Sequence, residues 1–474
     1  MADWSTLPLL PLTCILNHLR PEDAVKAMST CRHWRNAALL YEGHRDTLKL
    51  NIKQLEKCKF LTRLFKKNVK SLHLYIDCNE PEIERFMNLV FPQFFDTPHL
   101  RELIFIGPSY VQQNNHVPCI KLRRITIESL IYKNAMGLLK LGFLGCSLDT
   151  PKNENERYCH KAIEQHSRAL NFNTFPSPED NILTRANQPL MEYSAIEHII
   201  ADVEQITTCT LETLSSLPRL GYLSLNVTNK KLDQSYQPID WISLDDFFTD
   251  SPLRVGVNII GVPVRRFNDI MQKVLVEGLT LSSLKVMFCK SIYTPLISHV
   301  SRLFQNTLRE VMWVDSPYES TDQYHRVVRP LRETQPDTYA HVNPFVLMCW
   351  QCNNLERLVI HGYWLWQYDI LGFVRLRKDL QHLEVSAIYY RQDRFQHFIK
   401  MSEEGAIRVL SGDNPTHVDP DHIREVNEFI SYPWTPTRMS ELHPALRARA
   451  SARMRADYVL RETTAFLPPT INGE

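Results

Sequence analysis

A short hydrophobic pattern recurs along most of the chain. It begins with an aliphatic residue and continues with two variable and often charged positions. It ends with two apolar residues that are separated by one residue. The pattern occurs at Val69–Leu74, Leu100–Phe105, Leu122–Ile127, Leu220–Leu225, Leu281–Val286, Leu308–Trp313, Leu355–Ile360 and Leu380–Val385, and in weaker form at Gly137–Phe143 and Ser251–Gly261. The two final apolar residues share one face of a β-strand, because side chains alternate along a strand with a period of two. The recurrence therefore predicts a series of similar strands, each introduced by one apolar residue.

The spacing of these segments predicts the architecture. Starts at 100 and 122 lie 22 residues apart, at 253 and 281 28 apart, at 281 and 308 27 apart, and at 355 and 380 25 apart. Leucine-rich repeats have periods of about 20–29 residues, and each strand joins a parallel sheet. Helical spacing between the strands predicts return helices at Pro81–Phe95 and Phe267–Val276, and Thr47–Ile52 followed by Gln54–Lys67 predicts a first strand and its helix.

We therefore expect an α/β solenoid of degenerate leucine-rich repeats, with a parallel strand face and helical return segments. The alternative is an ordinary alternating α/β sheet, which does not require the same leading residue in every unit. The charged pairs at the variable positions are expected to be exposed: Arg101-Glu102, Arg123-Arg124, Arg309-Glu310 and Glu356-Arg357. Polar insertions near 149–180 and 315–343 interrupt the array, and such insertions either bind partners or are tolerated surface loops.

The N-terminal segment has a helical pattern instead. A single apolar stripe on a first helix is formed by Leu12, Ile15, Leu16 and Leu19. Pro21 ends this helix, because the residue before a proline is disfavoured in the α region, and the same proline suits the first turn of a second helix. Cys31, Trp34 and Ala38 predict a third helix. A module of this size does not easily bury so many bulky side chains, so we expect an apolar face that meets another protein or the rest of the chain.

The segment Leu7–Arg35 resembles an F-box. The shared features are Leu-Pro, an aliphatic helix ending in Leu, a Pro-x-Asp turn and Cys-Arg-x-Trp-Arg. The resemblance implies a helical module that docks the Skp-type adaptor of a cullin-RING ubiquitin ligase. It also implies that the docking surface or its support is shaped by Leu7, Pro8, Leu12, Ile15, Leu16, Leu19 and Trp34.

Three positions depart from the F-box pattern. Leu10 replaces an acidic residue, Pro11 replaces an aliphatic residue, and Thr30 lies where valine is common. Pro11 is tolerated in the first turn of a helix, where its missing N–H has no intrahelical partner. The alternative interpretation of the whole segment is a helical cap packed on the following domain.

A second resemblance lies near the end of the array. Asn343–Ser386 is similar to the corresponding segment of a subset of F-box proteins, through a Trp-x-Cys helix, a strand ending in His-Gly-Tyr, a Trp and an Arg-Leu-Arg run. Within it, Trp364 and Trp366 are candidate anchors for a bound substrate if they are exposed, and a core role is an equal alternative.

Composition favours an intracellular protein. Hydrophobic residues make up 44% of the chain and charged residues 23%, and the formal net charge is +1. This balance does not favour nucleic acid or a membrane as a partner. The 11 cysteines lack a disulfide-like spacing and no stretch is apolar enough to span a bilayer, so we expect a cytoplasmic or nuclear location.

We identify no active site, cofactor or metal site in the sequence. Cys349-x-x-Cys352 lacks a second ligand pair, so we interpret the two cysteines as core residues. Gly412–His422 contains three Asp and two His, but its prolines favour a linker over a metal site. The run His443–Glu462 is rich in arginine, and a solvated terminal helix is the default, with nucleic acid or a phosphorylated partner as the alternative.

These predictions define three regions and a function. The regions are an F-box at 1–42, degenerate repeats at 43–412 and a partly helical C-terminal extension at 413–474. The expected function is that of a non-catalytic receptor subunit of a ubiquitin ligase, with an unknown protein substrate. The alternatives are a repeat scaffold whose F-box-like segment is a structural cap, and a hydrolase within the insertions.

Overall fold

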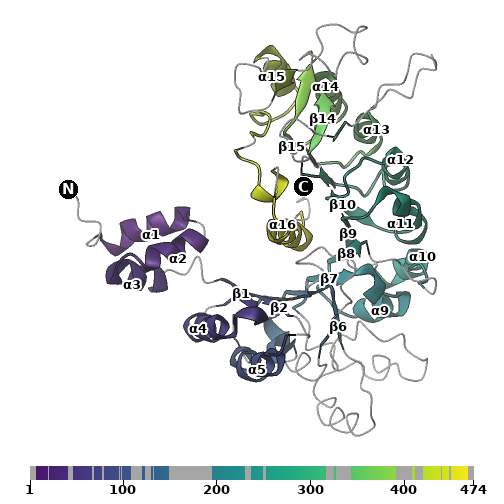
Figure 1. Cartoon of the computed structure of the whole chain (residues 1–474). Helices are drawn as coiled ribbons and strands as arrows, with labels where there is room; N and C mark the ends of the chain where they lie inside the picture. The colour runs from purple at the N-terminus through teal and green to yellow at the C-terminus, as the bar shows by residue number, and fades with distance from the viewer. Residues whose placement is uncertain are drawn as a thin grey trace, which may run out of the picture. The chain divides into compact units, whose positions relative to one another are not determined.

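The computed structural model of the chain (Figure 1) comprises two compact units. Unit 1 contains Met1–Pro108, Cys119–Glu197 and Leu217–Arg219, and unit 2 contains Ser109–Pro118, His198–Ser216 and Leu220–Glu474. The structure describes residues 7–19, 21–40, 46–66, 69–76, 80–95, 97, 99–107, 120–122, 130–131, 133–148, 195–229, 236–248, 252–316, 325–326, 343–390, 408–410, 420–438, 440–447 and 450–467. Within these ranges, no helix has both the length and the hydropathy needed to cross a membrane.

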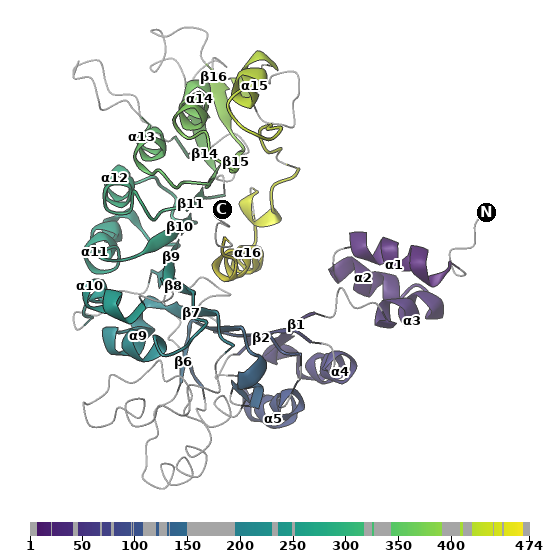
Figure 2. The same cartoon turned by 180° about the vertical axis from the view of Figure 1, so that it is seen from behind.

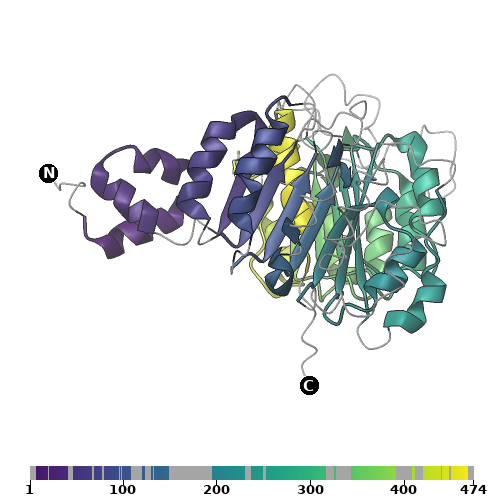
Figure 3. The same cartoon turned by 90° about the horizontal axis from the view of Figure 1, so that it is seen from below.

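Unit 1 begins with three helices, α1 (Leu9–His18), α2 (Pro21–Met28) and α3 (Arg32–Leu40), which Figure 3 shows packed together. The predicted helix break before Pro21 is confirmed, since α1 ends at His18 and α2 starts at Pro21. Pro11 lies in the first turn of α1, as its chemistry requires. The amide of Leu12 still donates to the Pro8 carbonyl oxygen at 3.2 Å, so the proline leaves the start of the helix intact.

The rest of unit 1 alternates strands and helices. Its elements are β1 (Thr47–Asn51), η2 (Ile52–Gln54), α4 (Leu55–Phe65), β2 (Ser71–Tyr75), α5 (Ile83–Leu89), η3 (Phe91–Phe94), β3 (Glu102–Ile106), β4 (Ile120–Leu122), η4 (Ala135–Gly137), β5 (Lys140–Leu144) and β6 (Cys146–Leu148). The strands β1, β2, β3 and β5 pair in this order, all parallel. The predicted first strand and helix and the return helix after β2 are therefore confirmed.

The repeated pattern explains how this sheet is held together. The first apolar strand positions form one row across the sheet, and the second positions form another: Leu48, Leu72, Leu103 and Leu141, then Leu50, Leu74, Phe105 and Phe143. All eight side chains are buried. Burying one such side chain contributes about 1.5–3 kcal/mol, and each is buried by its neighbours in the row, so the repeats stabilise one another.

Unit 2 also alternates strands with helices and contains more strands than unit 1 among the described residues. Its elements are β7 (His198–Asp202), η7 (Val203–Gln205), α9 (Thr208–Leu214), β8 (Tyr222–Thr228), α10 (Trp241–Leu244), η8 (Asp245–Phe248), β9 (Arg254–Ile260), η9 (Val264–Arg266), α11 (Phe267–Lys273), β10 (Leu281–Met287), α12 (Thr294–Leu303), β11 (Glu310–Val314), β12 (His325–Arg326), α13 (Pro344–Gln351), β13 (Arg357–His361), β14 (Tyr363–Trp366), α14 (Gln367–Leu376), β15 (His382–Val385), β16 (Ile388–Tyr390), β17 (Arg408–Leu410), α15 (Pro420–Asn427), η11 (Pro444–Leu446) and α16 (Ala452–Thr464). The strands β7, β8, β9, β10, β11, β13 and β15 pair in this order, all parallel.

Both units therefore have the predicted parallel strands with helical return segments. In unit 2 the inner rows include Leu284, Val311, Leu358 and Leu383, which are in register and buried. A bulge between Leu281 and Ser283 absorbs the shorter spacing of the weak repeat at β9, where Leu281 pairs with Val255 and Ser283 with Gly256.

Two details of the repeat prediction need correction. Leu122 does not lead a sheet strand: it ends β4, which pairs only with β6 among the described strands, and residues 123–129 lie outside the described residues. The strand beside β3 is β5, from the weaker pattern Gly137–Phe143. The insertion near 149–180 and most of that near 315–343 also lie outside the described residues.

The C-terminal segment belongs to unit 2 and covers two parts of its sheet. At the last strand, Leu383 donates its N–H to the Tyr432 hydroxyl at 2.7 Å and accepts from Trp434 Nε1 at 3.0 Å. These side chains satisfy backbone groups at the sheet edge. Farther on, α16 lies on the opposite side of strands β9–β11 from helices α11–α13, as both Figure 1 and Figure 2 show.

Candidate functional site

The helices α1 and α3 pack around a small internal core. Leu12 and Leu16, four residues apart on α1, are 0% and 1% exposed, and Ala37 on α3 is buried with them. The ring of His33 on α3 forms a hydrogen bond with the Leu7 carbonyl oxygen at 2.6 Å, and Arg35 Nε donates to the Met28 carbonyl oxygen at 3.2 Å. These contacts fix the segment before α1 and the end of α2 against α3.

Apolar residues remain at the surface at the start of α1. Leu9 is 50% exposed and Leu10 is 79% exposed, and Pro8 beside them is also exposed. The other predicted adaptor-contact residues Leu7, Ile15, Leu19 and Trp34 are half-buried. Five of the seven predicted residues therefore reach the surface, while Leu12 and Leu16 support it from inside. Leu9 and Leu10 are not among the predicted adaptor-contact residues.

A buried ionic cluster lies on the strand face of unit 2. Glu310, at the start of β11, is 1% exposed, and Ser283 Oγ donates to its carboxylate at 2.6 Å. Lys285 Nζ lies 3.4 Å from the same carboxylate, and Arg357 forms a second ion pair with it. Burial alone would raise the pKa of Glu310, but the charges of Lys285 and Arg357 outweigh burial and lower it.

The expectation that Arg309-Glu310 and Glu356-Arg357 are exposed is therefore wrong. The parallel register places Glu310 between Ser283 and Arg357, so its carboxylate is paired inside the sheet face. Arg309 pairs in two hydrogen bonds with Glu356, at 2.8 and 2.7 Å, and both side chains are largely buried. Of the other two pairs, Arg101 is exposed as expected, Glu102 is paired and largely buried, and residues 123–124 lie outside the described residues.

Unit 1 contains the same cluster in a more open form. Glu102 starts β3, as Glu310 starts β11, and accepts from Ser71 Oγ at 3.0 Å. His73 Nε2 lies 2.7 Å and Lys140 Nζ 3.1 Å from its carboxylate. The Glu102 side chain is 19% exposed, against 2% for Glu310. Burial raises the pKa of Glu102, but the hydrogen bond from His73 and the charge of Lys140 together lower it to about 2.

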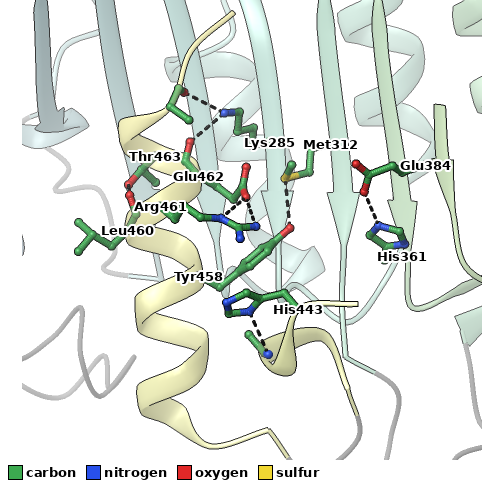
Figure 4. Close-up of polar contacts among 12 residues, drawn as sticks. Lys285, Met312, His361, Glu384, His443, Tyr458, Leu460, Arg461, Glu462 and Thr463 are labelled. Atoms are coloured by element: carbon green, nitrogen blue, oxygen red, sulfur yellow. Dashed lines mark hydrogen bonds and ion pairs between the residues drawn. The ribbon is translucent and has the colours of Figure 1, made fainter. Parts of the chain in front are cut away.

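The C-terminal helix α16 lies over the strands of unit 2 and contacts Lys285 of the cluster, as Figure 4 shows. Lys285 Nζ donates to the main-chain oxygens of Glu462 and Ala465, at 2.8 and 3.0 Å. The Tyr458 hydroxyl lies 3.7 Å from Met312 Sδ. The prediction of a solvated terminal helix is therefore wrong, because five residues of α16 that lie between or after its arginines are buried: Ala456, Tyr458, Val459, Leu460 and Thr463.

The two candidate tryptophans, Trp364 and Trp366, lie on β14. The side chain of Trp364 lies outside the described residues. Trp366 is half-buried at the junction of β14 and α14, where its ring meets that of Tyr368 edge-on with centroids 4.8 Å apart. The backbone N–H of Trp366 donates to the Asp369 carboxylate at 3.3 Å. Its role as a substrate anchor stays a prediction.

The interpretation of the C-x-x-C cysteines as core residues is confirmed. Cys349 and Cys352 are both 0% exposed, and burial raises the pKa of both thiols, that of Cys352 to about 12. Thiols held neutral in this way are poor nucleophiles and poor metal ligands. Among the described residues, no three His, Cys, Asp or Glu side chains gather as metal ligands would. Most of Gly412–His422 lies outside the described residues.

Comparisons with known proteins identify the domain formed by the N-terminal helices. Residues 4–42 match the family model of the F-box domain. The chain is 23% identical to F-box only protein 33 of Homo sapiens over 229 residues, which cover 47% of this chain and 34% of that protein. It is 42% identical to F-box only protein 33 of Mus musculus over 45 residues, which cover 9% of this chain and 8% of that protein.

These matches are partial. The chain spans about a third or less of the length of the two curated relatives. Among solved structures, the crystal structure of a TLR13–ssRNA13 complex is similar with a TM-score of 0.25 and 12% identity, covering 76% of this chain and 55% of that chain. That TM-score is too low to assign a fold. The helices α1–α3 are an F-box domain, and beyond it the chain is distantly similar to F-box only protein 33.

Proposed function

We propose that this chain is the substrate-recognition subunit of an SCF-type cullin-RING ubiquitin ligase in the cytoplasm or nucleus. The F-box docks a Skp-type adaptor, and the adaptor connects it to the cullin and RING subunits. The repeat units hold a target protein. The observation that carries the proposal is the F-box match at residues 4–42, together with the apolar surface at the start of α1.

The proposed mechanism is proximity, without catalysis by this chain. A target held on the repeats meets a ubiquitin-charged enzyme recruited by the RING subunit. Holding two reactants in one assembly replaces a bimolecular encounter by a high effective concentration. The stacked rows of buried side chains suit this role, because closely packed repeats are rigid and would hold a bound target in a fixed position.

Co-purification of the full chain with a Skp-type adaptor tests the proposal. We expect a stoichiometric complex with the unchanged chain. Ile15→Asp places a charge among the half-buried residues of α1 and should weaken adaptor binding at least about tenfold, as loss of a central interface residue does. His18→Ala changes an exposed residue of the same helix outside the predicted set and is the matched control.

Failure of the folded chain to bind the adaptor would favour the alternative, in which the F-box serves as a structural cap for a repeat scaffold. Leu16→Ala separates the two interpretations further. Because Leu16 is internal, its truncation should destabilise the helical module by about 2–5 kcal/mol. The strands should keep their stability under the proposal and lose it if the module caps them, which hydrogen exchange measures separately.

A further inference from the structure

The C-terminal segment crosses the strand face of unit 2. Tyr458 contacts Met312 on β11, the last turn of α16 meets Lys285 on β10, and Phe466 reaches the rings on β7 and β8. Arg254 on β9 donates to the Leu467 carbonyl oxygen at 3.2 Å. Residues 452–467 therefore occupy the face from β11 to β7.

The contact at Lys285 recognises a helix end and not a particular side chain. The last carbonyl groups of a helix have no intrahelical partner and carry the negative end of its dipole. The Lys285 ammonium group, on a side chain only 2% exposed, donates to two of these oxygens. Another helix that ended at the same place would satisfy Lys285 equally well.

The contact at Phe466 is an aromatic slot. Its ring stacks on Tyr222 with centroids 4.8 Å apart and meets His198 edge-on at 5.0 Å. Phe466 follows the end of α16 by two residues. The strand face therefore selects a helix whose last turn is followed closely by an aromatic residue.

The strand face under α16 is polar, unlike the face toward the return helices. Ser224, Asn226, Asn258, Lys285 and Glu310 alternate with the apolar inner rows and are buried. Their partners lie on the neighbouring strands: Asn258 donates to Asn226, Lys285 pairs with Glu310, Ser224 bonds to His198, and Ser283 donates to Glu310. The matching cluster Ser71-Glu102-Lys140 of unit 1 keeps the same pairing with about a fifth of the Glu102 and Lys140 side chains exposed. The charged network can therefore stay paired without a helix over it, whereas an apolar surface of the same size would have to remain covered.

We propose that this strand face is a binding surface for an amphipathic helix, that residues 452–467 are its resident occupant, and that a target protein binds by displacing them with a helix of the same chemistry. The inference rests on the proposed function, because it names where the repeats hold the target. The target helix ends over Lys285 and carries an aromatic residue for the slot formed by His198 and Tyr222. The C-terminal segment thereby blocks the surface until a target competes for it.

Hydrogen exchange on the unchanged full chain is the first test. A displaceable helix opens locally, so the amides of α16 should exchange at least about tenfold faster than those of β10 and β11. Equal exchange rates in α16 and the two strands would mean that α16 opens only with the whole unit, which overturns the proposal.

Binding of a labelled peptide in trans is the second test. The probe is a synthetic peptide with the sequence of residues 450–468, and the receptor is the full chain with Tyr458→Ala and Phe466→Ala, which weaken its own segment. Fluorescence anisotropy should show binding to this variant and much weaker binding to the unchanged chain. A peptide with the same two alanines should not bind. No binding of the first peptide, or loss of the folded strands in the variant, overturns the proposal.

A third test compares the same substitution at Lys285 and at a control lysine. Lys285→Met added to the chain with Tyr458→Ala and Phe466→Ala should weaken peptide binding about tenfold, the size expected for a hydrogen bond from a charged donor. Lys378→Met, at an exposed lysine of the same unit, should leave binding unchanged. Equal peptide affinity of the two variants overturns the role of Lys285 as the donor that binds the carbonyl oxygens of a helix end.

The two proposals fail separately. Adaptor binding depends on α1–α3 and should be the same for the unchanged chain and for the variants at Tyr458, Phe466, Lys285 and Lys378. If the adaptor binds and the peptide does not, the inference is wrong and the proposed function stands. If the peptide binds and the adaptor does not, the surface is real but serves a protein outside a ubiquitin ligase.

Discussion

The two units use one ionic arrangement in two environments. In unit 1, Ser71, Glu102 and Lys140 lie side by side on neighbouring strands, and in unit 2, Ser283, Glu310 and Arg357 do the same. The Glu102 side chain is 19% exposed and that of Glu310 is 2% exposed. The additional element in unit 2 is α16, whose carbonyl groups bind Lys285.

This difference shows that pairing and burial have separate origins. The strand register alone brings the serine, the carboxylate and the cation together, because the repeats stack the same position of each strand. The covering helix then removes water from a network that is already paired. Removing water strengthens the attraction between paired charges. It also raises the free-energy cost of leaving one of these charges without its partner. The same substitution should therefore have a larger effect in unit 2 than in unit 1.

The largest effect is expected for Glu310→Ala. It leaves Lys285 and Arg357 without their shared carboxylate in a buried site, and such a loss destabilises by about 3–5 kcal/mol. Urea unfolding, with hydrogen exchange on β10 and β11 to locate the effect, measures it. Glu56→Ala is the control, since the ion pair of this exposed carboxylate with Lys59 should contribute little to stability.

A smaller loss is expected for Ser283→Ala. The hydroxyl donates to Glu310 at 2.6 Å, and a hydrogen bond to a charged group contributes about 1.5–3 kcal/mol. Ser71→Ala removes the matching bond in the more open cluster, at 3.0 Å, and should lower stability by less. Unfolding of both variants under the same conditions gives the comparison directly, and equal losses would contradict the role of α16 in sequestering the cluster.

Glu102→Ala should have a modest effect of about 1–2 kcal/mol, between that of a surface pair and that of a buried pair. The remaining cation Lys140 can regain water because its side chain is 20% exposed. Added salt should reduce the effect of Glu102→Ala more than that of Glu310→Ala, because exposed charges are screened more strongly. Urea unfolding at low and high salt measures both.

The last prediction concerns the acid dependence of the Glu102 cluster. Its folded-state pKa of about 2 lies below the ordinary value of 4.5, so its charge stabilises the folded state above pH 4.5. That contribution should be lost as the pH falls from about 4.5 toward about 2. Glu102→Gln should remove this part of the acid dependence, which stability curves between pH 2 and 6 would reveal.

The sequence was sufficient for the repeated core. The spacing of Leu72 and Leu74, or of Leu284 and Val286, fixes which residues share a strand face, and stacking puts them in register with their neighbours. The strand β7 was missed because Ala201 replaces the second bulky residue, although Ile196 and Ile199 keep the rest of the pattern. The F-box helices followed from local rules, since Pro21 and the apolar stripe of α1 act over a few residues.

Only the tertiary structure decided which polar residues are buried and which apolar residues are not. Glu310 has the sequence signature of an exposed strand end, yet its neighbours lie 27 and 47 residues away in the chain. Leu10 is apolar but remains 79% exposed, because the small helical module has too few neighbours to cover it. The helix α16 has the arginine content of a solvated helix, and its docking on Lys285 joins residues 177 positions apart. Local pattern determines the faces of strands and helices, whereas burial depends on contacts between distant segments, which no local pattern encodes.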